Sequence, residues 1–276
     1  MRLLLLFTLC FLSLFSFAQP KKVRPLKILF LGNSYTFVND LPQICVGVAA
    51  SAGDVISFDS YAPGGYSLQQ HASDSNTVNK IKQGDWDHVV LQEQSRRPSF
   101  PIKEVERDVF PYAHSLDSMI HLYNPSAKTM FYMTWGKENG DSVKCKPWAE
   151  VCTYKGMDNL LALRYSSMAE MNKADISPVG AVWRFIRDNY PSIKLYQEDE
   201  SHPTEAGSYA AAVCFYTLLF KKDPGVIKYN YTLSNSDALK IRVTVKKIVF
   251  DNLSKWEFNR KNVEKVPLKA LNQKAG

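Results

Sequence analysis

Short apolar runs alternate with longer amphipathic stretches along most of this chain, and this alternation limits the folds that it can adopt. Strands that alternate with helices pair in parallel through right-handed crossovers, and the helices then cover both faces of the sheet. We therefore predict an α/β fold, a three-layer α/β/α sandwich with a central parallel sheet. The expected strands are Lys27–Leu31, Val55–Tyr61, His88–Leu91, Thr129–Thr134 and Lys194–Tyr196. The expected helices are Leu41–Ala52, Ser67–Gln83, Lys103–Tyr123, Lys155–Asn172, Val179–Asn189, Thr204–Leu219 and Ser236–Phe258.

The N-terminal segment, residues 1–18, has the features of a secretory signal peptide. Arg2 gives it a positive start, an apolar run follows, and Ala18 is a small residue at the expected cleavage site. We expect this segment to be removed and the protein to be exported to the periplasm or the cell exterior. Residues 19–276 are enough for one α/β domain, with a core at about 26–260 and a basic tail after 261. No later stretch has the roughly 20 consecutive apolar residues of a membrane-spanning helix, so no stable membrane insertion is expected.

The chain is basic, with a formal net charge of +7, but its positive residues are scattered over exposed-looking segments and both ends of the chain. Scattered basic segments are more typical of solvated helix faces and tails than of a nucleic-acid-binding surface. We therefore expect no nucleic-acid partner.

The cysteines indicate one local disulfide at most and no metal site. Cys10 lies inside the apolar run of the signal peptide, where it is poorly placed for lipid attachment. Cys145 and Cys152 flank a short loop and could pair with each other, which an exported protein permits. Cys45 and Cys214 lie in apolar helical patterns and are expected to be buried thiols. No cysteine or histidine pair has the short spacing of zinc ligands, so no metal is expected.

Side chains that could carry chemistry follow three of the expected strands. Ser34 comes just after the first strand, and Gln92 and Gln94 follow the strand at 88–91. Trp135 follows the strand at 129–134. Ligands of open α/β sheets bind beyond the carboxyl ends of the strands. We expect these residues to share one edge of the sheet, with Gln92 and Trp135 as candidate substrate contacts.

A serine nucleophile needs a neighbouring base, and the base needs an orienting group. His202 can act as the base for Ser34, and Asp199, three residues before His202, can hold the imidazole in the correct tautomer. The order Ser, Asp, His is the one found in hydrolases on parallel α/β sheets. Taken alone, Ser34 could be a helix N-cap, and Glu198 or Glu200 could replace Asp199. The combination favours a catalytic triad of Ser34, His202 and Asp199.

The sequence resembles the SGNH/GDSL-type hydrolase superfamily over about residues 26–219. Gly32-Asn33-Ser34 corresponds to its Gly-Asp-Ser block, with Asn in place of Asp. Asp199-Glu-Ser-His202 corresponds to its Asp-x-x-His block. The resemblance implies an SGNH/flavodoxin-like sheet and the same two catalytic positions.

The resemblance also implies an oxyanion hole, formed by the Ser34 amide, a glycine amide and an Asn side chain. The glycine is expected to be Gly65, with Gly64 as the alternative. At the Asn block this chain has Gln92-Glu93-Gln94-Ser95, which makes it similar to a divergent branch with Gly-Asn-Ser and Leu-Gln-Glu-Gln-Ser motifs. Gln94 would then replace the Asn, with Gln92 as the alternative donor.

The resemblance implies a secreted serine esterase that hydrolyses short-chain acyl esters, acetyl above all, on a small molecule or a glycan. No cofactor is required by this chemistry. The aromatic-rich loop from Trp135 to Tyr154 could stack on sugar rings. Two alternatives remain open: a non-catalytic glycan-binding protein on the same fold, and an acyltransferase that uses the same triad. The oligomeric state is open as well.

Overall fold

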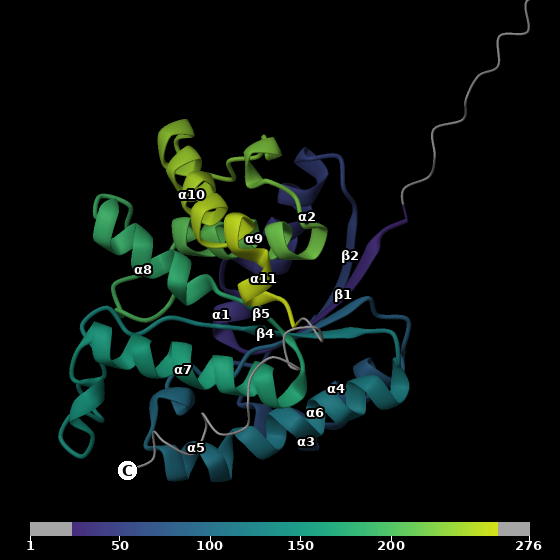
Figure 1. Ribbon diagram of the computed structural model, residues 1–276, viewed down its shortest axis with the longest axis vertical. Helices are drawn as coiled ribbons and strands as arrows, with labels where there is room; N and C mark the ends of the chain where they lie inside the picture. The colour runs from purple at the N-terminus through teal and green to yellow at the C-terminus, as the bar shows by residue number, and fades with distance from the viewer. Residues whose placement is uncertain (1–23, 259–276) are drawn as a thin grey trace, which may run out of the picture.

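A five-stranded, all-parallel sheet forms the centre of the molecule in the computed structural model, which describes residues 24–258 (Figure 1). The order β2-β1-β3-β4-β5 is that of the flavodoxin-like doubly wound sheet. The predicted α/β/α fold is therefore confirmed. The predicted signal peptide, residues 1–18, and the predicted basic tail after residue 261 lie outside the described residues. The strands are β1 (Leu26–Leu31), β2 (Ile56–Tyr61), β3 (His88–Leu91), β4 (Lys128–Tyr132) and β5 (Asp175–Ser177).

Helices cover both faces of the sheet (Figure 1). One layer contains α2 (Leu41–Ser51), α8 (Val179–Asn189), α9 (Glu205–Phe220), α10 (Asn235–Ile248) and α11 (Leu253–Trp256). The other contains α3 (Leu68–Ser73), α4 (Ser75–Lys82), α5 (Ile102–Asp108), α6 (Phe110–Tyr123) and α7 (Tyr154–Asn172). The short α1 (Ser34–Phe37) follows β1, and 3₁₀ turns lie at η1 (Val38–Asp40), η2 (Arg97–Ser99), η3 (Ala149–Val151), η4 (Pro224–Val226) and η5 (Phe250–Asn252). None of the helices within residues 24–258 has the length and hydrophobicity of a membrane span.

One strand prediction is wrong, and one strand was missed. Lys194–Tyr196 is not part of the sheet, and Tyr196 forms only an isolated antiparallel bridge with Pro203. The fifth strand is β5, which pairs with β4 so that Ile176 lies opposite Phe131. Its sequence, Asp-Ile-Ser, contains one large apolar residue, so no apolar run marks it.

Three predicted helices are divided in the structure. The first divides at Asp74, whose carboxylate oxygen Oδ1 accepts a hydrogen bond of 2.7 Å from the Asn76 amide and begins α4. The predicted helix Lys103–Tyr123 divides at Val109, because Pro111 has no amide hydrogen to donate to the helical hydrogen-bond pattern. The third ends as α10 and continues as η5 and α11. The divided predictions are Ser67–Gln83, Lys103–Tyr123 and Ser236–Phe258.

The sheet order places a crevice between the carboxyl ends of β1 and β3. From β1 the chain crosses to β2 on one side, and it returns to β3 on the other side, which makes this the topological switch point. Ser34 follows β1 by three residues, and Gln94 follows β3 by three. The residues predicted to carry chemistry thus belong to the edge where doubly wound sheets bind their ligands.

Candidate active site

Ser34 stands on a tight turn at the end of β1. A Cβ atom on Gly32 would come within 2.4 Å of Thr36 Oγ1 and 2.6 Å of Gln92 Oε1, so the turn can pack this closely only with glycine there. Asn33 then caps α1, because its Oδ1 accepts a hydrogen bond of 3.3 Å from the Tyr35 amide. Ser34 is the first residue of α1 and keeps its side chain partly exposed.

The structure brings the three predicted triad residues into one hydrogen-bonded chain. His202 Nε2 lies 2.8 Å from Ser34 Oγ, and His202 Nδ1 is hydrogen-bonded to Asp199 Oδ2. The other carboxylate oxygen of Asp199 accepts from the amides of Ser201 and His202, at 3.0 and 2.9 Å. Asp199, and neither of the neighbouring glutamates, therefore occupies the orienting position beside the imidazole.

The electrostatics of this chain suit proton transfer. Partial burial alone would raise the pKa of Asp199, but hydrogen bonds from the His202 ring and from the His202 and Ser201 amides lower it below its usual value. Asp199 is therefore ionised at neutral pH and favours the imidazole tautomer with its proton on Nδ1. Nε2 is then free to accept the proton of Ser34.

A stack of three aromatic rings packs against the ring of His202. Trp183 stacks on Trp135 at a centroid distance of 3.6 Å, and Trp135 stacks on Tyr35 at 4.6 Å. The ring of Tyr35 meets the His202 ring edge to face at 5.5 Å. Both Tyr35 Oη and Trp135 Nε1 bind Ser201, at 2.6 Å to its Oγ and 3.1 Å to its carbonyl oxygen. The stack thus fixes the loop that carries Asp199 and His202.

This stack corrects the prediction for Trp135. Its side chain has no exposed surface and is held between two other aromatic rings, so it supports the triad and does not line a substrate pocket. Gln92 requires the same correction, since it is also fully buried. Its Oε1 accepts from the Asn33 amide at 3.0 Å, and its Nε2 donates to Asn33 Oδ1 at 2.8 Å. Gln92 therefore holds the nucleophile turn from inside.

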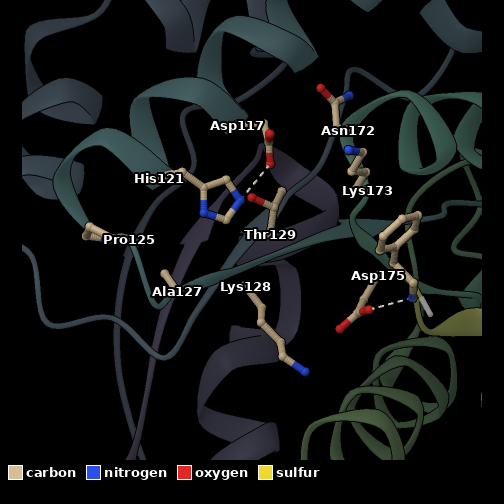
Figure 2. A pocket seen from close by; sticks show the side chains of 10 residues that line it. Asp117, His121, Pro125, Ala127, Lys128, Thr129, Asn172, Lys173 and Asp175 are labelled. Atoms are coloured by element: carbon tan, nitrogen blue, oxygen red, sulfur yellow. Dashed lines mark hydrogen bonds and ion pairs between the residues drawn. The ribbon is translucent and has the colours of Figure 1, made fainter. Parts of the chain in front are cut away.

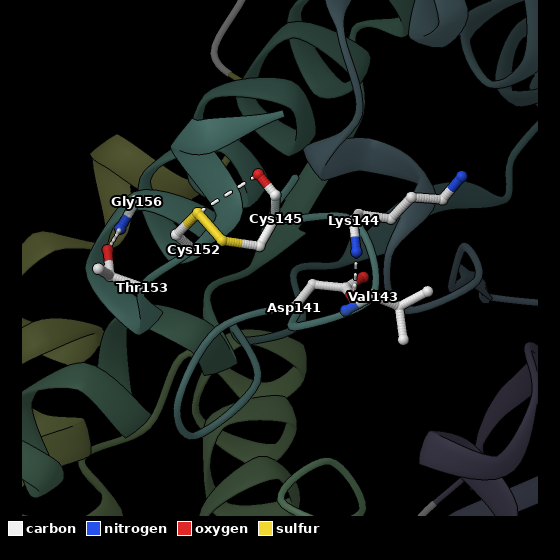
Figure 3. The surroundings of a disulfide bond; sticks show 7 residues. All are labelled: Asp141, Val143, Lys144, Cys145, Cys152, Thr153 and Gly156. Atoms are coloured by element: carbon white, nitrogen blue, oxygen red, sulfur yellow. Dashed lines mark hydrogen bonds between the residues drawn. A yellow bond between two sulfur atoms is a disulfide. The ribbon is translucent and has the colours of Figure 1, made fainter. Parts of the chain in front are cut away.

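The loop after β4 is cross-linked and lies against the triad loop. Cys145 and Cys152 form a disulfide, as their spacing permits, and Figure 3 shows the turn that it closes. Asp141, four residues before Cys145, donates its amide hydrogen to the carbonyl oxygen of Val151 at 2.7 Å. Earlier in the same loop, the Glu138 amide donates to the carbonyl oxygen of Glu200 at 2.9 Å. Glu200 lies between Asp199 and His202 in the sequence. Cys45 and Cys214, as predicted, are buried thiols.

The predicted oxyanion donors lie at the same edge of the sheet. Gly65 is exposed and has a φ of +72°, a left-handed conformation that glycine adopts without strain. Within residues 24–258, neither the Ser34 amide nor the Gly65 amide donates a hydrogen bond to another protein group. Gln94 is half-buried, and its Oε1 accepts from the amides of Arg96 and Arg97 at 2.9 and 3.3 Å. Its Nε2 donates to Ser95 Oγ at 3.5 Å, the one hydrogen bond of this atom within residues 24–258.

No protein-family model and no curated protein matches this chain. A DUF4886 family protein from Bacteroides uniformis matches with a TM-score of 0.71 at 15% identity, over 81% of this chain and 94% of that one. A candidate SGNH hydrolase from Slackia heliotrinireducens matches with a TM-score of 0.58 at 24% identity, over 71% of this chain and 100% of that one. This chain has the SGNH-hydrolase fold. A candidate GDSL-like lipase from Parabacteroides merdae matches with a TM-score of 0.50 at 12% identity, over 71% and 97% of the two chains.

Two residues of this SGNH-hydrolase fold that we did not predict hold the edge together. Asn33 Nδ2 donates to the carbonyl oxygens of Tyr66 at 2.8 Å and Glu93 at 3.3 Å, which ties the nucleophile turn to the two neighbouring segments. Glu93 is fully buried, and its Oε1 accepts from the amides of Gln94 at 2.6 Å and Leu68 at 3.3 Å. The sequence did contain a signal for Glu93, which follows the buried strand β3 by two residues. An acid at such a place is expected to be buried, and a buried acid must be hydrogen-bonded or neutral.

His71, a histidine outside the triad, has structural contacts. His71, which follows the glycine turn, is fully buried beneath the nucleophile, with Nε2 2.8 Å from the Gly32 carbonyl oxygen and Nδ1 2.8 Å from Thr77 Oγ1. Burial lowers its pKa. It therefore braces the turn as a neutral ring.

The hollow drawn in Figure 2 lies away from the triad. It has a volume of about 720 Å³, and its lining includes Asp117, His121 and Lys128, at the amino end of β4. Ser34 follows the carboxyl end of β1, at the opposite edge of the sheet. In the hollow, His121 Nε2 lies 3.4 Å from Asp117 Oδ1. Among residues 24–258, no group of three or more His, Cys, Asp or Glu side chains could hold a metal ion.

Proposed function

We propose that this protein is a serine esterase that hydrolyses short-chain acyl esters, acetyl esters above all. The observation that supports this most strongly is the continuous hydrogen-bonded chain from Ser34 Oγ through the His202 ring to the Asp199 carboxylate. The SGNH-hydrolase fold supports it independently. The predicted signal peptide supports an exported enzyme, and the resemblance of the sequence motifs supports carbohydrate esters as substrates.

In this proposal Ser34 Oγ attacks the ester carbonyl carbon while His202 Nε2 takes the hydroxyl proton. Asp199 holds the ring in place and stabilises the imidazolium that forms. The tetrahedral intermediate collapses when His202 passes the proton to the leaving alcohol, which leaves an acyl group on Ser34. A water molecule, deprotonated by His202, then attacks the acyl-enzyme and releases the carboxylic acid.

The negative charge of the intermediate needs donors in fixed positions. The amides of Ser34 and Gly65 are proposed as two of them, since each lacks a protein acceptor within the described residues. The third is the side-chain amide of Gln94, whose oxygen is engaged by two backbone amides so that its NH₂ group is turned away from them. A single donor of this kind typically contributes a factor of about 10²–10³ in turnover.

The test is hydrolysis of 4-nitrophenyl acetate and 4-nitrophenyl butyrate by the purified protein and by its Ser34→Ala and His202→Ala variants. Each substitution should lower kcat by about 10³-fold or more, because each removes a member of the triad. Ser73→Ala, at an exposed serine of α3, is the matched control and should retain activity. Equal activity of Ser34→Ala and the unaltered protein would refute the serine mechanism. Absence of activity on both esters would favour the non-catalytic binding protein.

A further inference from the structure

The turn that carries the Gly65 amide has little packing of its own. A Cβ atom added to Gly64 or to Gly65 would meet no atom within 4 Å beyond its chain neighbours. The Tyr66 amide closes this turn with a hydrogen bond of 3.2 Å to the carbonyl oxygen of Pro63. Of the two glycines, the second alone has a positive φ, +72°, which is the pattern of a type II turn. We call residues 63–66 the glycine turn, and its position depends on contacts made by Tyr66.

The backbone of Tyr66 joins the glycine turn to the nucleophile turn. The carbonyl oxygen of Tyr66 accepts a hydrogen bond of 2.8 Å from Asn33 Nδ2. Asn33 directly precedes Ser34 in the chain. Tyr66 directly follows Gly65. This hydrogen bond therefore connects the neighbours of the two amides proposed for the oxyanion hole, and a shift of Tyr66 would change the distance between those amides.

The side chain of Tyr66 is held at its hydroxyl group. Tyr66 Oη donates to Asp74 Oδ2 at 2.8 Å. The other carboxylate oxygen of Asp74 accepts from the Asn76 amide at 2.7 Å, at the start of α4, so the acceptor is itself held in place. The hydrogen bond to this carboxylate raises the pKa of Tyr66 to about 12. The hydroxyl group therefore remains a donor throughout the neutral range of pH.

The ring of Tyr66 packs on the buried His71. The centroids of the two rings lie 5.1 Å apart and their planes meet at 73°, which is an edge-to-face contact. His71 Nε2 in turn lies 2.8 Å from the carbonyl oxygen of Gly32. Tyr66 thus contacts the nucleophile turn directly through Asn33, and it contacts the same turn indirectly through His71.

Tyr61 binds the same carboxylate and has a different relation to the glycine turn. Its hydroxyl group donates to Asp74 Oδ2 at 3.1 Å, and its ring meets the Tyr66 ring edge to face at 6.1 Å. Tyr61 is the last residue of β2, where pairing with Leu31 of β1 fixes its backbone. The hydroxyl group of Tyr61 can therefore be removed without releasing the glycine turn.

We propose that Tyr66 is a positioning residue for the oxyanion hole, whose hydroxyl and carbonyl hydrogen bonds hold the Gly65 amide at a fixed distance from the Ser34 amide. This inference rests on the proposed function, because it concerns how one of the proposed donors is kept in place. Tyr66 touches no reacting atom and acts through Gly65. Negative charge develops on the substrate oxygen in the transition state, so a displaced donor slows the chemical step and leaves the binding of the uncharged ester unchanged.

The experiment compares Tyr66→Phe, which keeps the ring and removes the hydroxyl group, with Tyr61→Phe, which removes the other hydroxyl group on Asp74. On 4-nitrophenyl acetate, Tyr66→Phe should lower kcat by about tenfold, less than the factor of about 10²–10³ for complete loss of a donor, and should change KM by less than about twofold. The inhibition constant of butylboronic acid, whose tetrahedral adduct with serine mimics the charged intermediate, should rise by a similar factor of about ten. Tyr61→Phe is the matched control and should leave kcat, KM and the inhibition constant unchanged.

Hydrogen exchange tests the hold on the glycine turn without any substrate. The amide of residue 66 closes the turn, so its exchange reports how often the turn opens. Exchange at this amide should be about threefold faster or more in Tyr66→Phe than in the unaltered protein, and unchanged in Tyr61→Phe.

The inference and the proposed function fail in different ways. Serine-dependent hydrolysis with the same kcat in Tyr66→Phe as in the unaltered protein would overturn the positioning role and leave the esterase intact. An equal loss of kcat in Tyr66→Phe and Tyr61→Phe would also overturn it, because both variants would then act through Asp74 and not through the glycine turn. Absence of serine-dependent hydrolysis would overturn the esterase. Faster exchange in Tyr66→Phe would then still support the hold of Tyr66 on the turn, and unchanged exchange would overturn that as well.

Discussion

Replacement of Glu93 by glutamine should change how the stability of this protein depends on pH. The Glu93 carboxyl group has no exposed surface and joins the segment after β3 to the start of α3 through the Gln94 and Leu68 amides. Burial raises the pKa of Glu93 from 4.5 to about 7, against the opposing effect of those backbone hydrogen bonds and of Arg97. The glutamine side chain keeps an oxygen for the two amides but cannot titrate.

The sign and size of the effect follow from the two pKa values. Because the folded protein holds this proton more tightly than the unfolded chain, the contribution of Glu93 is fully present below pH 4.5 and is lost as the pH rises through 7. A pKa that moves from 4.5 to about 7 corresponds to about 3 kcal/mol of unfolding free energy. The difference in stability between the unaltered protein and Glu93→Gln should therefore shrink, or reverse, by about 3 kcal/mol between about pH 4 and pH 8.

Urea unfolding at about pH 4, 6 and 8, followed by tryptophan fluorescence, measures this difference directly. Any loss of packing in Glu93→Gln lowers stability equally at all three values, so the slope against pH isolates the titration. Glu106→Gln, at an exposed position of α5, is the control and should run parallel to the unaltered protein. If Glu93→Gln also runs parallel, Glu93 does not titrate in this range and the reasoning from burial is wrong.

Three further outcomes are expected. Asp199→Asn should lower kcat on 4-nitrophenyl acetate by about 10²–10⁴-fold with an unchanged thermal midpoint, and undiminished kcat would show that Asp199 does not orient the base. Trp135→Ala should lower the free energy of unfolding by about 3–5 kcal/mol in urea, since the ring is fully buried, and a loss below about 1 kcal/mol would contradict its place in the stack. Cys145→Ser should cost about 2–3 kcal/mol, and reduction of the unaltered protein should cost the same, whereas reduction of Cys145→Ser should have no further effect.

The sequence alone was enough to predict the layered fold and to single out Ser34, His202 and Asp199, which the structure joins by hydrogen bonds. The apolar runs at β1, β3 and β4 are long enough to be recognised, and helical patterns fill the gaps between them. The residues from Gly32 to Ser34 and from Asp199 to His202 are local motifs, in which the spacing along the chain already limits the distance in space. Hydrophobic periodicity and short-range motifs are therefore what a sequence reports best.

The tertiary structure decided which of the neighbouring polar residues face the site. Gln92 and Gln94 are two residues apart, yet one is buried under Asn33 and the other lies at the edge, because the direction of a side chain after a strand depends on the turn that follows. Trp135 is of a residue type that often binds sugars, and it becomes part of the core only because α8 brings Trp183 against it. The short strand β5 exists only through its pairing with β4. Each of these features depends on a contact between segments far apart in the chain, and such contacts leave no periodic signal in the local sequence.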